Sequence, residues 1–377
     1  MTLIARVPVR GAPIVVGDVL LSSERKTGLR TNLPLVGDIN QILAKGGLSF
    51  EVGFAQKVNI LSDRLVVAWS GPCLQAERAL RVLSTACSRQ NLSRSDIKRE
   101  LEAIDPDQVN KLQLIGLLIT DVRGTTVTGS PFQWRVQGRD VPRLGTVYAA
   151  GTGKEEFIRK LGLTDWTIGG AANEFGVAHL LLGDLVNMEF RGGGTIENRW
   201  GGGFEAVTFT SDSGRLQKVG DILHTFWAVD ARSPDKAQFV PMFYKTTYWR
   251  DALIVRYARF DGISERTFQL AMNSFELIPP LLKTAKEYDL KELGSVDFSH
   301  KVLCCHVAIE RPGGRDVMQI MQPSKPDATV ELEFHGSDSS GRLHIPGELS
   351  KMVIEDSRRW ASSQYPFQSP GVAISRR

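Results

Sequence analysis

Apolar residues near the start of the chain occur in short runs that are typical of β-strands. Residues 2–9 (TLIARVPV) and 13–21 (PIVVGDVLL) are two such runs, and the turn between them contains Gly11. A second pair of apolar runs follows at 57–61 and 64–69. The pattern predicts two hairpins in this part of the chain.

The spacing of apolar residues changes to a helical period after the second hairpin. Residues 74–88 place apolar side chains on or near one face of a helix, and Ser93 with Asp96 marks the start of another helix. Residues 22–56, between the hairpins, are expected to be a long loop or insertion with a short helix near 39–44. Strands are expected next at 112–121, 125–127, 132–136 and 146–150, helices at 154–161 and about 169–190, and a closing hairpin at 204–210 and 216–219.

The order of these elements favours a layered fold. It runs strands, two helices, strands, two helices and strands, and the early strands are apolar on both faces, as buried strands are. Two sheets between two helix layers fit this order, whereas P-loop and Rossmann folds do not. We therefore expect residues 1–225 to form an α+β domain, a four-layer αββα sandwich.

The pattern changes after about residue 225. Strands are expected at 250–260, 301–309 and 327–334, helices at 267–275, 279–288 and 348–362, and a loose tail over the last dozen residues. We interpret residues 226–377 as a C-terminal α+β extension of unknown fold and function. Two domains also suit a chain of 377 residues, because one domain usually takes roughly 100–200 residues.

Charge and cysteine usage narrow the functional classes. The chain has 46 Lys and Arg against 42 Asp and Glu, and no basic block stands out, so we expect no nucleic-acid and no membrane partner. Cys73, Cys87, Cys304 and Cys305 form no CxxC spacing and fit a reducing cytoplasm. The N-terminal residues lack the pattern of a signal peptide, and no apolar run reaches the ~20 residues of a membrane helix. We therefore expect a cytoplasmic protein.

The remaining motifs give little support for a cofactor or a metal. Residues 151–154 (GTGK) look like a phosphate loop, but Tyr148 stands where its first glycine belongs. His306, beside Cys304 and Cys305, is expected to pack rather than to bind a metal. The sequence therefore predicts neither a cofactor nor a metal.

Thr2 is the residue with the most specific chemical setting. Aminopeptidases remove an initiator Met when the next side chain is small, so the mature chain would begin with the free amine of Thr2. A hydroxyl and an amine on one residue supply both nucleophile and base. Catalysis would further need a cation held by a carboxylate, a backbone N–H facing the oxyanion and a hydroxyl that relays a proton.

Residues of these types occur at a characteristic spacing. Asp18 follows Thr2 by sixteen residues at a strand end, Lys57 opens the strand KVNIL, and Gly71 lies fourteen residues after Lys57. Thr152 stands in a Gly-Thr-Gly turn before a helix. In these features residues 2–225 resemble the proteasome β-subunits and their bacterial relatives, which are N-terminal nucleophile hydrolases.

The resemblance implies a threonine-type endopeptidase. It implies that Thr2 is the nucleophile, that Asp18, Lys57 and Thr152 are catalytic, and that the N–H of Gly71 forms the oxyanion hole. An acyl-enzyme would form on Thr2 and be released by water.

The resemblance also implies a substrate pocket and partners. It places Leu21, Trp69 and Cys73 at the pocket, and the size of Trp69 predicts a shallow pocket for small or slender side chains. Family members form rings that enclose their active sites, which implies a homo-oligomeric ring, peptide or unfolded protein as substrate, and an ATP-dependent unfoldase as a candidate partner.

Two departures from the family pattern keep other functions open. About twenty-three extra residues lie between Asp18 and Lys57, and Asn198 and Gly201 stand where many β-subunits have an Asp and a Ser. A catalytically inactive ring or scaffold protein is one alternative. An N-terminal nucleophile amidase acting on a small amide is the other.

Overall fold

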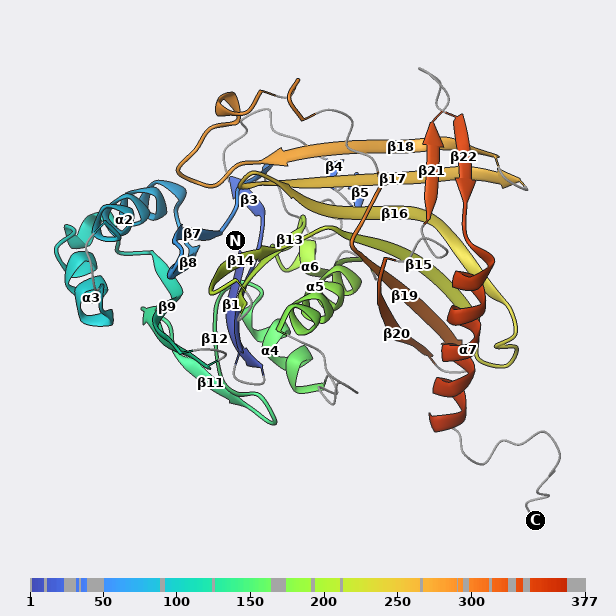
Figure 1. Cartoon of the computed structure of the whole chain (residues 1–377), viewed down its shortest axis with the longest axis horizontal. Helices are drawn as coiled ribbons and strands as arrows, with labels where there is room; N and C mark the ends of the chain where they lie inside the picture. The colour runs from blue at the N-terminus through green and yellow to red at the C-terminus, as the bar shows by residue number, and fades with distance from the viewer. Residues whose placement is uncertain are drawn as a thin grey trace, which may run out of the picture. The chain divides into compact units, whose positions relative to one another are not determined.

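The structure is a computed structural model, shown as a cartoon in Figure 1. It describes residues 2–9, 12–23, 32–33, 35–38, 51–88, 92–123, 126–163, 174–190, 194–210, 213–264, 267–289, 291–293, 298–311, 314–324, 330–334 and 340–364. The chain divides into two compact units. Unit 1 comprises Met1–Gly220, Thr246–Val255 and Phe275–Gly294, and unit 2 comprises Asp221–Lys245, Arg256–Ser274 and Ser295–Arg377.

Two sheets that belong to unit 1 carry the expected hairpins. The first has the order β11-β12-β1-β2-β13-β14, and the second has the order β10-β9-β8-β7. Their bounds are β1 Leu3–Val9, β2 Ala12–Asp18, β7 Val58–Ser62, β8 Leu65–Ser70, β9 Gln113–Arg123, β10 Thr126–Trp134, β11 Gly138–Val141, β12 Gly145–Gly151, β13 Phe204–Thr210 and β14 Arg215–Val219. The pairings β1–β2, β7–β8 and β13–β14 confirm the predicted hairpins. The strands expected at 125–127 and 132–136 form one strand, β10, which is continuous but shifts register at Thr128/Gly129.

Helices of unit 1 begin and end close to the expected positions. They are α2 Cys73–Ala86, α3 Arg94–Glu102, α4 Lys154–Leu163, α5 Glu174–Phe190 and the short α6 Gly194–Glu197. Ser93 and Asp96 form the expected capping box, because the Ser93 hydroxyl accepts from the Asp96 N–H and the Asp96 carboxylate accepts from the Ser93 N–H. Figure 1 shows α2 and α3 side by side, and α2 packs on β7 and β8.

Apolar side chains join the two sheets of unit 1. One core cluster contains Ile4 and Val15 from the first sheet and Val66, Ala68 and Ile115 from the second, all fully buried. Full burial of an aliphatic side chain of Val or Ile size contributes roughly 1.5–3 kcal/mol. This shared core fixes the strand ends, including those that carry Thr2 and Asp18, relative to one another.

The region expected to be a loop contains short strands. β3 Leu20–Ser23 pairs with β6 Glu51–Phe54, and β4 Asn32–Leu33 pairs with β5 Gly37–Asp38. The helix expected near 39–44 lies outside the described residues. The β3–β6 pairing brings the two ends of the insertion together.

The second half of the chain is dominated by one large sheet. Its order is β20-β19-β15-β16-β17-β18-β22-β21, and Figure 1 shows β16, β17 and β18 as long neighbouring strands. The bounds are β15 Ile222–Asp230, β16 Ala237–Trp249, β17 Ala252–Ser264, β18 Thr267–Ile278, β19 Val302–Arg311, β20 Gly314–Pro323, β21 Glu331–Phe334 and β22 Ser340–His344. One helix, α7 Gly347–Gln364, confirms the helix expected at 348–362, and it contacts β19 and β20.

The expected αββα four-layer sandwich with an α+β extension is wrong. Strands far outnumber α-helices among the described residues, and they form several sheets in which antiparallel pairing dominates. The helix predicted at 267–275 lies inside β18, and the one predicted at 279–288 is a single 3-10 turn, Ala285–Glu287. Pairing with neighbouring strands overrode the local helical pattern, because strand preference depends on context more than helix preference does. The chain is therefore a mostly β protein.

No helix among the described residues is both long and apolar enough to cross a membrane.

Candidate active site

Thr2 lies at the start of β1, where two neighbouring segments hold its backbone. β1 pairs with β12 so that Leu3 lies opposite Gly151, and this register places Thr2 beside the Gly-Thr-Gly turn. The Thr2 N–H donates to Thr152 Oγ1 at 3.2 Å, and the Gly153 N–H donates to the Thr2 carbonyl at 3.2 Å. Gly151 has φ +94°, and a Cβ on it would overlap the Thr2 carbonyl oxygen. The turn therefore needs glycine at this position to approach Thr2 so closely.

Asp18 organises the site, since its carboxylate accepts four hydrogen bonds. Oδ1 accepts from Thr2 Oγ1 at 2.8 Å, from the Leu3 N–H at 3.0 Å and from Lys57 Nζ at 2.5 Å. Oδ2 accepts from the Gly201 N–H at 2.8 Å. The side chain is fully buried, and a buried carboxylate is stable only when donors replace its water. Asp18 thus links the nucleophile candidate to the lysine candidate.

Lys57 lies directly before β7 and is fully buried. Its ammonium donates to Asp18 Oδ1 and, at 2.5 Å, to the Leu20 carbonyl. Burial lowers the pKa of Lys57 from its usual value, and the nearby Asp18 carboxylate opposes this effect. The insertion therefore does not keep Lys57 from Asp18, because the chain returns to Asp18 through the β3–β6 pair.

A second buried carboxylate fixes the backbone at Lys57. Glu205 of β13 accepts from the Lys57 N–H at 2.5 Å and from the Val58 N–H at 2.7 Å. Its other oxygen pairs with Lys218 Nζ at 2.8 Å. These bonds hold the start of β7 in place and so aim the Lys57 side chain at Asp18.

Glu189, like Glu205, is a residue near the site that the sequence interpretation missed. It lies near the end of α5, is almost fully buried, and accepts from the Gly202 N–H at 2.9 Å. Burial raises the pKa of Glu189 to about 8 and outweighs the hydrogen bonds from the Gly202 and Gly203 N–H groups, which lower it; the negative charge of Asp18 contributes to the rise. The signal available in the sequence was a carboxylate within the apolar run LLLGDLVNMEF, which predicts a buried polar side chain.

The two positions that depart from the family pattern have different surroundings. The Asn198 amide donates to Glu156 at 3.3 Å and lies on the surface. Gly201 instead contributes its backbone N–H to Asp18 and has φ +113°. A Cβ at Gly201 would overlap Glu189 Oε2, so a serine does not fit here without movement of Glu189.

The expected oxyanion donor and the pocket residues are not hydrogen-bonded to the Thr2 group among the described residues. Gly71 follows β8, is exposed and has φ +126°, and a Cβ on it would lie 2.6 Å from the Lys111 carbonyl. Trp69 is buried in the core beside α2, where Leu21 packs against the same cluster, and its indole N–H donates to the Gln56 carbonyl. These two side chains share one apolar environment.

Cys73 opens α2 as an exposed thiol. Partial burial raises the pKa of Cys73, the Glu77 carboxylate adds to this rise, and the charge of Lys57 opposes it.

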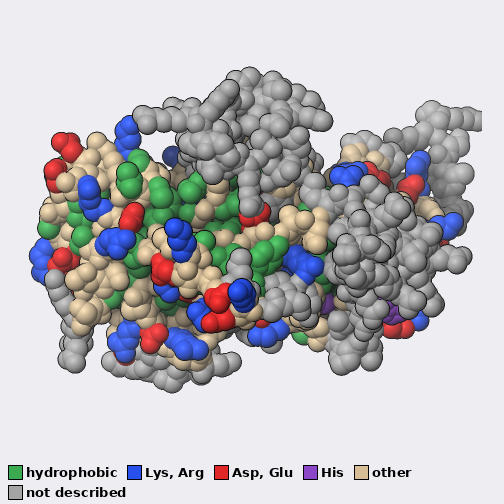
Figure 2. Space-filling view, turned by 90° about the horizontal axis from the view of Figure 1, so that it is seen from above, with side chains coloured by type: hydrophobic (Ala, Val, Ile, Leu, Met, Phe, Trp, Pro, Cys, Tyr) green, Lys and Arg blue, Asp and Glu red, His purple; other side chains and the backbone are tan. Residues whose placement is uncertain are grey.

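Among the described residues, the surface of the protein shown in Figure 2 has no large region of charge of one sign. In Figure 2, Lys and Arg side chains lie among Asp and Glu side chains over the described part of that face, without gathering by sign. The Lys57–Asp18 pair beside Thr2 is fully buried, and low surrounding polarity makes such a pair stronger than one at the surface. Chemically, the arrangement can polarise the Thr2 hydroxyl and orient the Thr2 nitrogen.

No family model matches this chain, and no curated protein matches it.

Proposed function

We propose that this protein is an N-terminal threonine peptidase of the proteasome type, which hydrolyses peptide bonds through an acyl-enzyme on Thr2. One observation carries the proposal: Thr2 Oγ1 and Lys57 Nζ share the buried oxygen Oδ1 of Asp18, while Thr152 Oγ1 lies 3.2 Å from the Thr2 nitrogen. Hydrogen bonds thus join Thr2 to Asp18 and Thr152, and Asp18 to Lys57. This arrangement suits a threonine nucleophile.

The reaction begins once Met1 has been removed and the Thr2 nitrogen is a free amine. Thr2 Oγ1 attacks the substrate carbonyl, its proton passes to the amine directly or through water, and the amine later gives that proton to the leaving nitrogen. Lys57, held by Asp18, stabilises the negative charge that develops on the hydroxyl oxygen. Thr152 orients the amine and relays the proton.

The second half of the reaction releases the product. Water attacks the ester on Thr2, the amine accepts the water proton, and Thr2 Oγ1 leaves with a proton. We assign the oxyanion to the Gly71 N–H and the substrate pocket to Leu21, Trp69 and Cys73. Further parts of the proposal are a homo-oligomeric ring, peptide or unfolded protein as substrate, an ATP-dependent unfoldase as partner, and a cytoplasmic location.

Intact mass with and without a peptide epoxyketone or β-lactone probe tests the proposal. The unlabelled protein is expected to lack the mass of Met1, and the probe is expected to add its own mass once per chain. Thr2→Ala and Thr2→Ser are matched variants, because both side chains are small enough to allow removal of Met1. We expect labelling to persist in Thr2→Ser and to vanish in Thr2→Ala, whereas retention of Met1 in the wild type would exclude the peptidase.

Two observations favour a second candidate, the catalytically inactive ring or scaffold protein. Thr2 is only 1% exposed in this chain, in which Met1 precedes it, and the Ser of many β-subunits is replaced by Gly201. A wild type that loses Met1 but takes no probe would support the scaffold. Turnover of small amides without turnover of peptides would instead support an amidase.

A further inference from the structure

Unit 2 contains a cluster of buried side chains that plays no part in the Thr2 chemistry. It consists of His224 on β15 and Cys304 and His306 on β19, with exposed fractions of 1%, 0% and 2%. The ligand atom of each residue lies within 4.8 Å of the other two. A thiol and two imidazoles are the ligands that borderline transition-metal ions prefer.

Strand geometry explains why these three side chains meet. β15 and β19 run parallel with His224 opposite Cys304, so these two side chains lie on the same face of the sheet. His306 follows two residues after Cys304 and therefore shares that face, whereas Cys305 between them points to the other face. Cys305 accordingly packs in the core of unit 2 with Leu223 and Val307.

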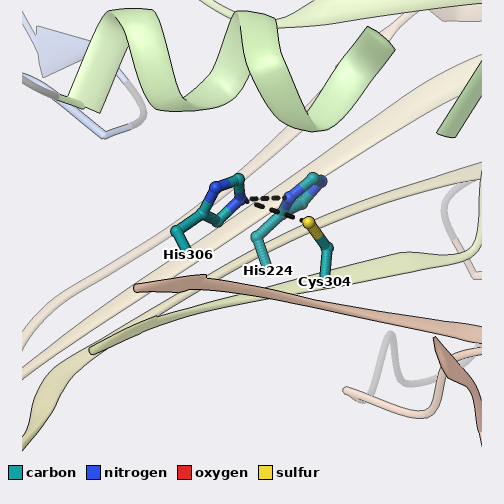
Figure 3. A group of neighbouring side chains, drawn as sticks. All are labelled: His224, Cys304 and His306. Carbon is teal, nitrogen blue, oxygen red and sulfur yellow. Dashed lines mark hydrogen bonds between the residues drawn. The ribbon is translucent and has the colours of Figure 1, made fainter. Parts of the chain in front are cut away.

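The three ligand atoms converge on one point. Figure 3 shows His224 and the Cys304 sulfur next to each other, with dashed lines joining both to the same nitrogen of His306. His224 Nδ1 lies 2.9 Å from His306 Nε2, and Cys304 Sγ lies 3.5 Å from the same His306 nitrogen.

These separations suit a metal ion at the centre. An ion about 2.05 Å from nitrogen and about 2.3 Å from sulfur would see the Cys304–His306 atom pair at about 107°, close to the tetrahedral angle. The two nitrogens need to move apart by about 0.4 Å to reach the same angle.

Aromatic groups enclose the cluster. Phe226 stacks on His306 with ring centroids 5.0 Å apart, and Tyr244 lies 5.5 Å from His224. An apolar shell of this kind limits water access and holds the ligand rings in position. The cluster is therefore a preorganised set of ligands rather than a chance surface group.

We propose that His224, Cys304 and His306 bind one borderline divalent transition-metal ion, of which Zn²⁺ is the usual example. The ion takes Nδ1 of His224, Nε2 of His306 and the thiolate of Cys304, and a water molecule or another ligand completes the tetrahedron. Binding releases the thiol proton to solvent, and the imidazole that donates in the metal-free cluster adopts the tautomer whose lone pair faces the ion. Hard oxygen-preferring ions such as Mg²⁺ and Ca²⁺ are excluded by the ligand types.

The ion would link β15 and β19, two strands that lie far apart in the sequence. His224 and Cys304 are eighty residues apart, and their strands, β15 and β19, pair in parallel in the large sheet. Because an unfolded chain does not preform the site, the binding free energy adds to the stability of unit 2. The proposed role is thus structural and independent of Thr2.

Metal analysis and cobalt titration of the full-length wild type test this inference without any variant. Protein purified in zinc-containing medium without chelators is expected to hold about one zinc per chain. After removal of zinc with a chelator, one equivalent of Co²⁺ is expected to give tetrahedral ligand-field bands and a thiolate-to-cobalt charge-transfer band. Substoichiometric zinc together with a Co²⁺ titration that gives no charge-transfer band would overturn the proposal.

Variants identify the ligands. Cys304→Ser is expected to abolish the charge-transfer band and to weaken zinc binding at least about tenfold, while Cys87→Ser, which changes a thiol elsewhere in the chain, should leave both unchanged. His224→Gln is the second ligand variant and keeps the thiolate. X-ray absorption of the wild-type zinc protein, which depends on no variant, is expected to show one sulfur and two imidazole nitrogens, and a shell without sulfur would contradict the assignment.

Discussion

Replacing Glu189 with Gln should make this protein more stable at neutral pH. The Glu189 side chain is almost fully buried, and one of its oxygens accepts from the Gly202 N–H. Burial raises the pKa of this carboxyl from 4.5 to about 8, so the folded protein keeps it protonated at pH 7. Gln has the shape of the protonated carboxyl, remains neutral at every pH and can accept the same Gly202 hydrogen bond.

The direction of the pH effect depends on whether the folded or the unfolded protein binds the Glu189 proton more tightly. Because the folded pKa lies above the unfolded one, Glu189 stabilises the fold fully below pH 4.5, and this stabilisation is lost as the pH rises through about 8. At about 1.36 kcal/mol for each pKa unit, the loss amounts to about 3 kcal/mol by pH 7 and about 4 kcal/mol by pH 8. The Gln variant does not undergo this loss.

Urea unfolding of the wild type and of Glu189→Gln at pH 4.5, 7 and 8 measures the effect. Other titrating groups are common to both proteins, so they cancel in the difference between the two free energies of unfolding. The difference is expected to be below about 1 kcal/mol at pH 4.5 and to reach about 3 kcal/mol in favour of the variant at pH 7. At roughly 2–4 °C per kcal/mol, thermal unfolding at pH 7 should show a Tm higher by about 6–12 °C.

A difference that stays constant from pH 4.5 to pH 8 would refute this reasoning. Glu205→Gln is the matched control, because Glu205 is equally buried but pairs with Lys218 at 2.8 Å. Burial raises the pKa of Glu205 as well, but the charge of Lys218 opposes this rise, and removing the carboxylate leaves Lys218 without its ionic partner. The gain in stability at pH 7 is thus expected to be smaller for Glu205→Gln than for Glu189→Gln.

Three further substitutions test other parts of the structure. Lys57→Met leaves the Asp18 carboxylate buried without its cation, and urea unfolding at pH 7 should show a loss of about 3–5 kcal/mol together with loss of probe labelling; full labelling would remove Lys57 from the mechanism. Gly201→Ala combines φ +113° with overlap on Glu189, so a loss of about 3 kcal/mol is expected, and an unchanged denaturation midpoint would contradict the close approach. Ser93→Ala removes the cap of α3 and should cost about 1 kcal/mol in the same assay; a neutral result would show that the capping hydrogen bonds are replaced by water.

Local patterns in the sequence were sufficient for most elements of the first half. The hairpin β1–β2, the amphipathic helix α2 and the capping box at Ser93 depend on residues near one another in the chain, so spacing and turn chemistry predict them. The helix predicted at 267–275 was wrong because the local pattern was taken alone. That segment is a strand between β17, which directly precedes it, and β22, where Arg342 lies opposite Thr267, and a partner as distant as β22 leaves no local signal.

The sequence also restricted the chemistry of the Thr2 site. The spacing of Thr2, Asp18, Lys57 and Thr152 predicted a group of residues that the structure joins by hydrogen bonds. The residue types and their order are properties of the chain itself, and so they were accessible before any fold was known.

Only the tertiary structure decided which groups share a buried space. Glu189 and Asp18 are connected by the backbone of Gly201 and Gly202, whose N–H groups donate to these two carboxylates. His224 and Cys304 are eighty residues apart in the sequence and come together because β15 and β19 pair in parallel. Both contacts depend on the register of strands and on the packing of distant elements, which the local pattern of apolar residues does not encode. Burial then sets the chemistry, because the same carboxyl or imidazole behaves differently once its water has been removed.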